Sequence, residues 1–367
     1  MSRVVPLARR NLLAEPRRLV ASAAGVGLAL MLILLLDGLW AGIDAKTTLY
    51  EDNSGADLYV AQPGTRNFFS STMSVIPAAT VEQVATDPDV SWAAPVRGLF
   101  SIMQLHDTKV PGYLVGWQPG QRGGPWDLTD GRVPETDNEI AVGQVLSQRH
   151  GVNVGDHLDI LGRSFTVVGI ANADMFMASF VFMTHAATDQ ILRSPDTTSF
   201  VLVGTDQPDQ VRARLAATGF AILDRDELKA NDLAVISRPF AVPLRVMVAV
   251  AFAVGSLVIA LTAYSAIVEH RRDYGIYKAL GADRTRLYRV ALTQTTILAA
   301  LGLAAGTVFF LAGRGLISMV RPQFAIVLTP TIVIRAVAVA VAMGLIAAVL
   351  PARRLARVDP STAYRGG

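Results

Sequence analysis

Four long apolar runs divide the chain into membrane-type and water-soluble parts. They cover residues 19–40, 244–268, 290–313 and 328–350, and each holds 22 to 25 residues. As an α-helix, such a run extends roughly 33–38 Å, enough to cross a hydrocarbon core of about 30 Å. We therefore predict four transmembrane helices, one before and three after a polar segment of about 200 residues.

The predicted fold class is an α-helical membrane protein with 1+3 transmembrane helices and a mixed α/β extracytoplasmic domain inserted between helices 1 and 2. The expected parts are an amphipathic cytoplasmic N-terminal helix (1–18), helix 1 (19–40), the extracytoplasmic domain with its stalk (41–242), helix 2 (243–268), a cytoplasmic loop (269–289), helix 3 (290–313), helix 4 (328–350) and a cytoplasmic tail (351–367).

Within the large polar segment, alternating and helical patterns follow one another, which is typical of an α/β domain. Strands are expected at 56–61, 90–105, 111–117, 139–142, 157–161, 164–170, 200–204 and 220–223, and helices at 80–86, 144–150, 208–218 and 226–237. Pro95, Pro111 and Gly112 are expected to be breaks, and residues 162–163 to join two strands in a hairpin. The last helix should feed helix 2 and be bounded by Pro239 and Pro243. Residues 120–134 are expected to form a loop, and Phe68 and Phe69 are either core residues or an exposed apolar contact.

The charges predict the orientation in the membrane. Residues 1–18, 269–289 and 351–367 carry net charges of +4, +3 and +3, whereas 41–242 holds 14 basic and 24 acidic residues. Basic short segments stay on the cytoplasmic side, so both termini should be cytoplasmic and the large domain outside. The sequence pI near 9.3 therefore reflects membrane topology and not nucleic-acid binding.

Charges inside the apolar runs are few and lie near their ends. They are Asp37, Arg245 and Arg335. A long side chain near a helix end reaches the headgroups, so interfacial anchoring is the simpler interpretation and a functional charge inside the bundle is the alternative.

Motifs of enzyme chemistry are missing from the sequence. There is no phosphate-binding G-x-x-x-x-G-K-[ST], no G-x-S-x-G and no H-E-x-x-H, and the five histidines are scattered. We expect no catalytic residue, no metal site and no cofactor in this chain. Without cysteines, the outer domain must rely on its own hydrophobic core.

Small residues at helical spacing occur in two of the predicted spans. Gly302 and Gly306 lie four apart in helix 3, and Gly38 and Gly42 at the end of helix 1. Such pairs permit close helix approach, either within one bundle or at a seam between two chains.

The predicted cytoplasmic loop has the pattern of a short docking helix. Asp273 can cap its start and Gly281 can supply its left-handed end. Ile276 and Leu280 share one face, which Tyr274 and Tyr277 flank. An apolar helix face that enters a groove is a common mode of partner recognition, so we expect a cytoplasmic protein to dock here.

This loop, EHRRDYGIYKALGA at 269–282, resembles the loop after the second helix in ABC-transporter permeases of the MacB/FtsX type. The tail from residue 350 (LPARRLARVDPSTAYR), the start ARRNLL with PRR, and NEIAVG, VGD and FTVVGI in the outer segment resemble other parts of the family. Together they cover nearly the whole chain.

The resemblance implies a non-catalytic subunit in the bacterial plasma membrane. Its partners would be a cytoplasmic ABC ATPase that carries ATP and Mg, a second permease chain in a homodimer or heterodimer, membrane lipid and an extracellular protein. The docking residues would be Asp273, Tyr274, Ile276, Tyr277, Lys278, Leu280 and Gly281, with Arg271 and Arg272 at the rim.

ATP hydrolysis would then move the helices, and stalks at 47–50 and 226–237 would carry this motion outward, for export or extraction of a substrate. The alternative function is a regulator that transmits force to an extracellular partner, such as a cell-wall hydrolase, without moving a substrate.

Overall fold

The computed structural model describes residues 16–69, 74–105, 108–176, 178–269, 284–320 and 324–356. The chain forms two compact units. The first, the membrane bundle, comprises residues 1–41, 240–320 and 326–367. The second, the outer unit, comprises residues 42–239 together with 321–325.

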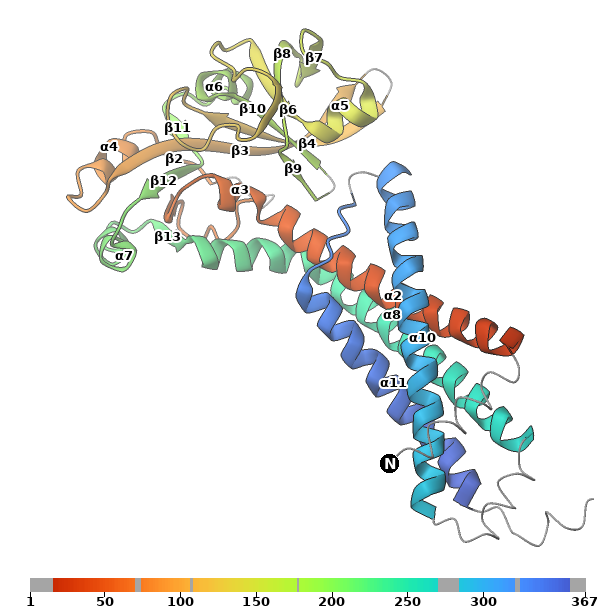
Figure 1. The fold of residues 1–367 in the computed structure, drawn as a ribbon. Helices are drawn as coiled ribbons and strands as arrows, with labels where there is room; N and C mark the ends of the chain where they lie inside the picture. The colour runs from red at the N-terminus through yellow and green to blue at the C-terminus, as the bar shows by residue number, and fades with distance from the viewer. Residues whose placement is uncertain are drawn as a thin grey trace, which may run out of the picture. The chain divides into compact units, whose positions relative to one another are not determined.

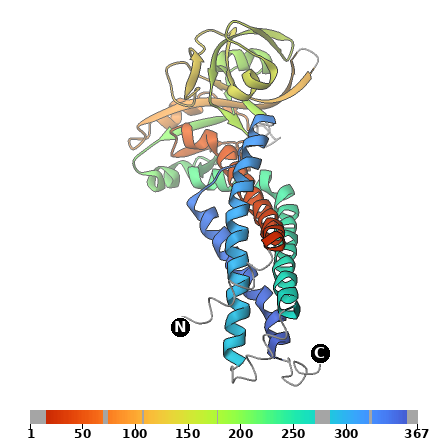
Figure 2. The same cartoon turned by 45° about the vertical axis from the view of Figure 1, so that its right-hand side comes forward.

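Four long helices make up the membrane bundle (Figures 1 and 2). They are α2 (Pro16–Thr47), α8 (Arg225–Glu269), α10 (Arg284–Val320) and α11 (Pro330–Ala356). Each is long and apolar enough to span a membrane, which agrees with the four predicted spans. Val26, Leu30, Ile259, Leu298 and Met343 meet in a buried core to which all four helices contribute.

Helix α8 differs from the expectation at its prolines. It is one continuous helix of 45 residues and passes through Pro239 and Pro243 without a break, so the prediction that these residues bound the preceding helix was wrong. Each proline removes one helical hydrogen bond. The long apolar run that follows must satisfy its backbone groups within the helix when it lies in lipid, which favours continuation.

One mixed sheet of 11 strands dominates the described part of the outer unit, in the order β13-β1-β12-β3-β4-β10-β6-β8-β5, with β7 on β8 and β9 on β10. A separate two-stranded sheet joins β2 and β11. The strands are β1 (Leu58–Ala61), β2 (Ile76–Pro77), β3 (Trp92–Leu105), β4 (Thr108–Trp117), β5 (Leu128–Gly131), β6 (Glu139–Gly143), β7 (His157–Ile160), β8 (Arg163–Ala171), β9 (Asp174–Met175), β10 (Ala178–Thr184), β11 (Thr197–Thr198), β12 (Phe200–Gly204) and β13 (Ala221–Asp224).

The sheet separates distinct cores because successive strand residues point to opposite faces. On β4, Tyr113 and Val115 belong to an aromatic cluster, whereas Leu114 belongs to an aliphatic one. The short helices are α3 (Leu49–Asn53), α4 (Thr80–Ala85), α5 (Gln144–His150), α6 (His185–Leu192) and α7 (Pro208–Ala216).

The predicted fold class is confirmed, and most of the expected strands and helices of the outer unit are present. Two predictions fail. β5 lies inside the segment 120–134 expected to be a loop. The expected breaks are also missing, because β3 runs through Pro95 and β4 runs through Pro111 and Gly112. The sequence reasoning also missed β10 and α6, although β10 pairs with both β4 and β6 near the middle of the sheet. A fully buried strand lacks the polar alternation by which half-exposed strands are recognised.

Candidate functional site

The chain enters and leaves the outer unit through two neighbouring helical segments. On the entering side, α2 ends at Thr47 and α3 follows at Leu49. On the leaving side, the first turns of α8 begin at Arg225. The Lys229 ammonium of α8 lies 2.6 Å from the Asp52 carboxylate of α3, so the two segments touch inside the outer unit. We call this region the junction.

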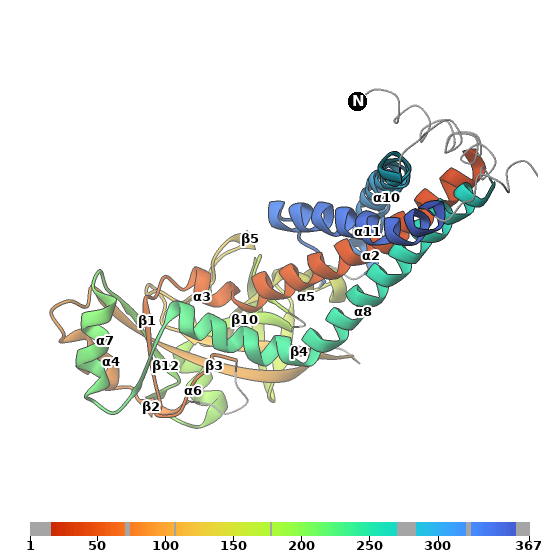
Figure 3. The ribbon, with the colours of Figure 1, turned by 90° about the horizontal axis from the view of Figure 1, so that it is seen from below.

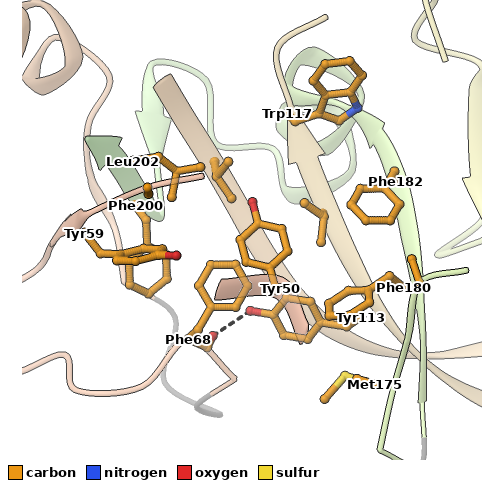
Figure 4. Packing of buried hydrophobic residues seen from close by; sticks show 14 of the residues in the cluster. Tyr50, Tyr59, Phe68, Tyr113, Trp117, Met175, Phe180, Phe182, Phe200 and Leu202 are labelled. Carbon is orange, nitrogen blue, oxygen red and sulfur yellow. Dashed lines mark hydrogen bonds between the residues drawn. The ribbon is translucent and has the colours of Figure 1, made fainter. Parts of the chain in front are cut away.

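Tyr50 of α3 anchors the entering segment in the aromatic core. Its ring is fully buried and stacks on Phe68, with centroids 4.4 Å apart and planes 16° apart (Figure 4). Its hydroxyl donates a hydrogen bond to the Gly123 carbonyl at 3.0 Å. Phe68 is itself held, because the Tyr113 hydroxyl donates to its carbonyl at 2.7 Å. Phe68 is thus a core residue, the first of the two alternatives that the sequence left open.

Asp232 anchors the leaving segment to the same loop. Its carboxylate is 1% exposed and accepts hydrogen bonds from the backbone N–H of Phe68 at 2.9 Å and of Phe69 at 3.3 Å. Glu51, beside Tyr50 on α3, is fully buried, and this burial raises the pKa of its carboxyl well above the ordinary value. The segment around Phe68 therefore contacts both connections to the membrane helices.

The glycines predicted to permit helix packing lie inside the bundle. A Cβ placed on Gly302 of α10 would overlap Val26 of α2, and one on Gly306 would lie 2.9 Å from the Gly27 carbonyl. Gly27 in turn approaches Ala305. These glycines therefore let α2 and α10 approach closely within a single chain.

Some polar contacts join the described bundle helices. The Thr262 hydroxyl of α8 donates to Ser22 of α2 at 2.8 Å, where Figure 3 shows the two helices side by side. Asp37 and Arg335, for which interfacial anchoring was the simpler interpretation, approach each other at 3.5 Å. Arg18 and Glu269 form an ion pair at 2.5 Å.

All of the predicted docking residues, from Arg271 to Gly281, lie outside the described residues, as does most of the amphipathic N-terminal segment 1–18. Among the residues that are described, no group of three or more His, Cys, Asp or Glu side chains could hold a metal ion.

The sequence reasoning predicted the two stalk segments but missed the residues that join them. Tyr50 was inside the predicted stalk 47–50 without a role, and Glu51 and Asp232 were not singled out. A weak signal existed for Asp232, because it follows the buried Leu228 by four residues and so shares its helix face. No pattern in the sequence indicates that this face meets Glu51.

Comparison with known proteins identifies related families over most of the chain. Residues 19–218 match the MacB-like periplasmic core domain, and residues 245–360 match the FtsX-like permease C-terminal family. The first match alone spans more than half of the chain.

Relatives of similar length are named as permeases of transport systems. An uncharacterized ABC transporter permease of Mycobacterium tuberculosis is 27% identical over 98% of this chain and 99% of its own length. A protein of Staphylococcus haemolyticus, which carries the name of a hemin transport system permease protein, is 23% identical over 65% of this chain and 67% of its own.

Among solved structures, the extracellular domain of the ABC-type transporter YknZ from Gram-positive bacteria covers 46% of this chain and 98% of that domain, at 14% identity and a TM-score of 0.35. The periplasmic region of MacB from Actinobacillus actinomycetemcomitans covers 48% of this chain and 92% of that region, at 12% identity and a TM-score of 0.37. On the family matches and the full-length relatives, the chain belongs to the ABC transporter permeases of the MacB/FtsX type.

Proposed function

We propose that this chain is the non-catalytic transmembrane subunit that converts ATP hydrolysis by a separate ATPase into motion of its outer unit, for export or extraction of a substrate. Both termini and the loop 269–289 are cytoplasmic in this proposal, because these segments are basic and the outer segment is acidic. A second permease chain completes the assembly.

The observation that carries the proposal is the junction. Both α2 and α8 run as membrane-type helices up to the outer unit, and both connections end in one buried contact network around Phe68. A movement of either helix is therefore transmitted to a packed core, since close-packed interiors transmit displacement instead of absorbing it. A flexible linker at either connection would lose the motion.

The test of the ATPase coupling uses the predicted docking helix. Ile276→Asp with Leu280→Asp places two charges on the apolar face, which should abolish co-purification of an ATPase from mild detergent. Thr285→Asp is the matched control, because Thr285 is exposed in the first turn of α10, where a carboxylate is tolerated. Retained ATPase in the double variant, with both chains folded, would refute docking through this face.

The orientation is tested separately by cysteine labelling, since the natural chain has none. Glu82→Cys on the exposed face of α4 should react with an impermeant maleimide added to intact cells, and Ser361→Cys only after lysis. The reverse pattern would overturn the topology.

The second candidate function is force transmission to an extracellular partner without a substrate. The support for it is that most residues that meet in the described bundle core are apolar and uncharged, with Ser22, Thr262 and Gln294 among the few buried polar ones. The two candidates are separated by measuring ATP-dependent changes in proteolytic protection of the outer unit in reconstituted vesicles. If protection changes while no small molecule stimulates ATP hydrolysis, force transmission is supported, and stimulation by a transported compound supports export.

A further inference from the structure

Two buried carboxyl groups meet at the junction, one from each connection to the membrane. Glu51 is on α3 and Asp232 is on α8, and their exposed fractions are 0% and 1%. Their carboxyl groups lie within hydrogen-bonding range of each other. A buried pair of carboxylates would place two negative charges together without water, which is strongly unfavourable. The pair must therefore hold a proton.

The hydrogen bonds show which carboxyl keeps that proton. Asp232 accepts hydrogen bonds from the backbone N–H groups of Phe68 and Phe69. These donors favour an ionised Asp232. Neither carboxyl oxygen of Glu51 receives a hydrogen bond from a donor in the described residues. Glu51 is therefore the acid, and its O–H donates to the Asp232 carboxylate.

The surroundings of the pair strengthen this assignment. Burial is the largest cause that raises the pKa of Glu51, followed by the charge of Asp232 and, more weakly, that of Asp52. The other titratable or charged groups nearby are three tyrosines and two basic residues, and each already has a hydrogen-bond partner. The tyrosines are Tyr50 of α3 with Gly123, Tyr59 of β1 with Ser54, and Tyr113 of β4 with Phe68. The basic residues, both on α8, are Lys229 with Asp52 and Arg225 with Ala56 and Asp57.

We propose that Glu51 and Asp232 form a proton-binding site that locks α3 to α8, so that separation of the two stalk segments releases one proton and their return takes one up. When the segments part, water reaches Glu51, its O–H bond breaks, the proton passes to water and the negative charge stays on the carboxylate. The site is a property of the folded chain and does not depend on coupling to an ATPase.

The sign of the pH dependence follows from the proton count. The closed junction holds one proton that the open or unfolded chain has lost at neutral pH, so acid favours the closed state and alkali the open one. The ratio of closed to open chains should therefore fall up to about tenfold for each pH unit. This fall begins just above the ordinary glutamate pKa of about 4.3 and stops at the pH where Glu51 ionises within the closed state.

The test compares Glu51→Gln with the natural chain in detergent. Glutamine keeps a donor toward Asp232 but cannot ionise. Urea unfolding of the outer unit, followed by tryptophan fluorescence at about pH 5, 7 and 9, should show stability that falls with pH in the natural chain and a flatter profile in Glu51→Gln. Glu82→Gln is the control, because this carboxylate is exposed on α4 outside the junction and its removal should leave the slope unchanged. Parallel profiles for the natural chain and Glu51→Gln would overturn the proposal.

Infrared spectroscopy provides a readout that a purely structural role would not change. The natural chain at neutral pH should show a carboxylic-acid C=O band that is missing in Glu51→Gln, and the absence of this difference would also overturn the proposal.

Burial also raises the pKa of Asp174, which could add a second band. If Glu51→Gln does not fold, the band is recorded in an Asp174→Asn chain, where its loss on alkaline titration supports the site and its absence at neutral pH refutes it.

Discussion

The outer unit and the membrane bundle hold their helices with opposite kinds of side chain. In the outer unit, α3 is fixed by large buried rings, with Tyr50 stacked on Phe68. In the bundle, α2 meets α10 through Gly302 and Gly306, where the backbones themselves come close. The difference follows from the solvent. Water drives large apolar groups together, whereas lipid gives no such drive and helix association depends on close packing and a few polar contacts.

This comparison bears on how easily each set of contacts rearranges. A stacked ring in a packed core resists displacement, because any shift opens a cavity. Smooth small-residue surfaces between helices have fewer interlocking side chains to rearrange. We therefore expect the packed contacts around Tyr50 to resist local rearrangement more than the small-residue contacts between α2 and α10.

The largest effect is expected at Tyr50. Tyr50→Ala removes the stacked ring and should lower the free energy of unfolding of the outer unit by about 3–5 kcal/mol. Tyr50→Phe keeps the ring and loses only the hydrogen bond to Gly123, so it should cost about 0.5–1.5 kcal/mol. Urea unfolding of the full chain in detergent measures both, and equal losses in the two variants would contradict the anchoring role of the ring.

The next effect is expected at Gly302. Gly302→Val overlaps Val26 of α2 and should destabilise the bundle by about 1–3 kcal/mol. Gly315→Val makes the same change on the same helix, where a Cβ would meet nothing within 4 Å, so it should be nearly neutral.

Thermal unfolding in detergent compares these two glycine variants, and size-exclusion chromatography records their oligomeric state. If Gly302→Val changed the oligomeric state without lowering the midpoint, the glycine would act at a seam between chains and not within the bundle.

The smallest effect is expected at the ion pair between Arg18 and Glu269. Both side chains are partly exposed, at 30% and 47%, so Arg18→Glu should cost no more than about 1 kcal/mol. The swapped double variant Arg18→Glu with Glu269→Arg should recover part of that loss in a double-mutant cycle. A loss well above this range would show that the pair is part of a larger charged network.

Much of the fold could be predicted from local patterns. The four spans, the helix at Thr80 and the hairpin of β7 and β8 were expected from runs of a few to about 25 residues. The failed predictions involve residues whose surroundings come from segments distant in the sequence. Pro95 reads as a break, yet it lies in register with Val201 on a neighbouring strand. The strand β10 has no local signal because both of its faces are buried.

The candidate site divides in the same way. The stalk segments were expected from the family resemblance, but the residues that join them could not be predicted. The Asp232 carboxylate accepts a hydrogen bond from the backbone N–H of Phe68, which lies 164 residues earlier in the chain. No local sequence pattern indicates a contact between residues so far apart in the sequence. The docking helix, predicted from residues 273–281 and from family resemblance, lies outside the described residues and stays a prediction.

By itself, the sequence determined that the chain has four helices long and apolar enough to cross a membrane, that a large polar segment separates the first from the second, and which family it resembles. Short continuous stretches of sequence determine these properties, since transfer of a helix into lipid depends on the length and apolarity of one contiguous segment. Only the tertiary structure decided that Gly302 faces α2 and that Glu51 meets Asp232. Such meetings depend on how distant segments pack, and burial then determines whether a carboxyl keeps its proton.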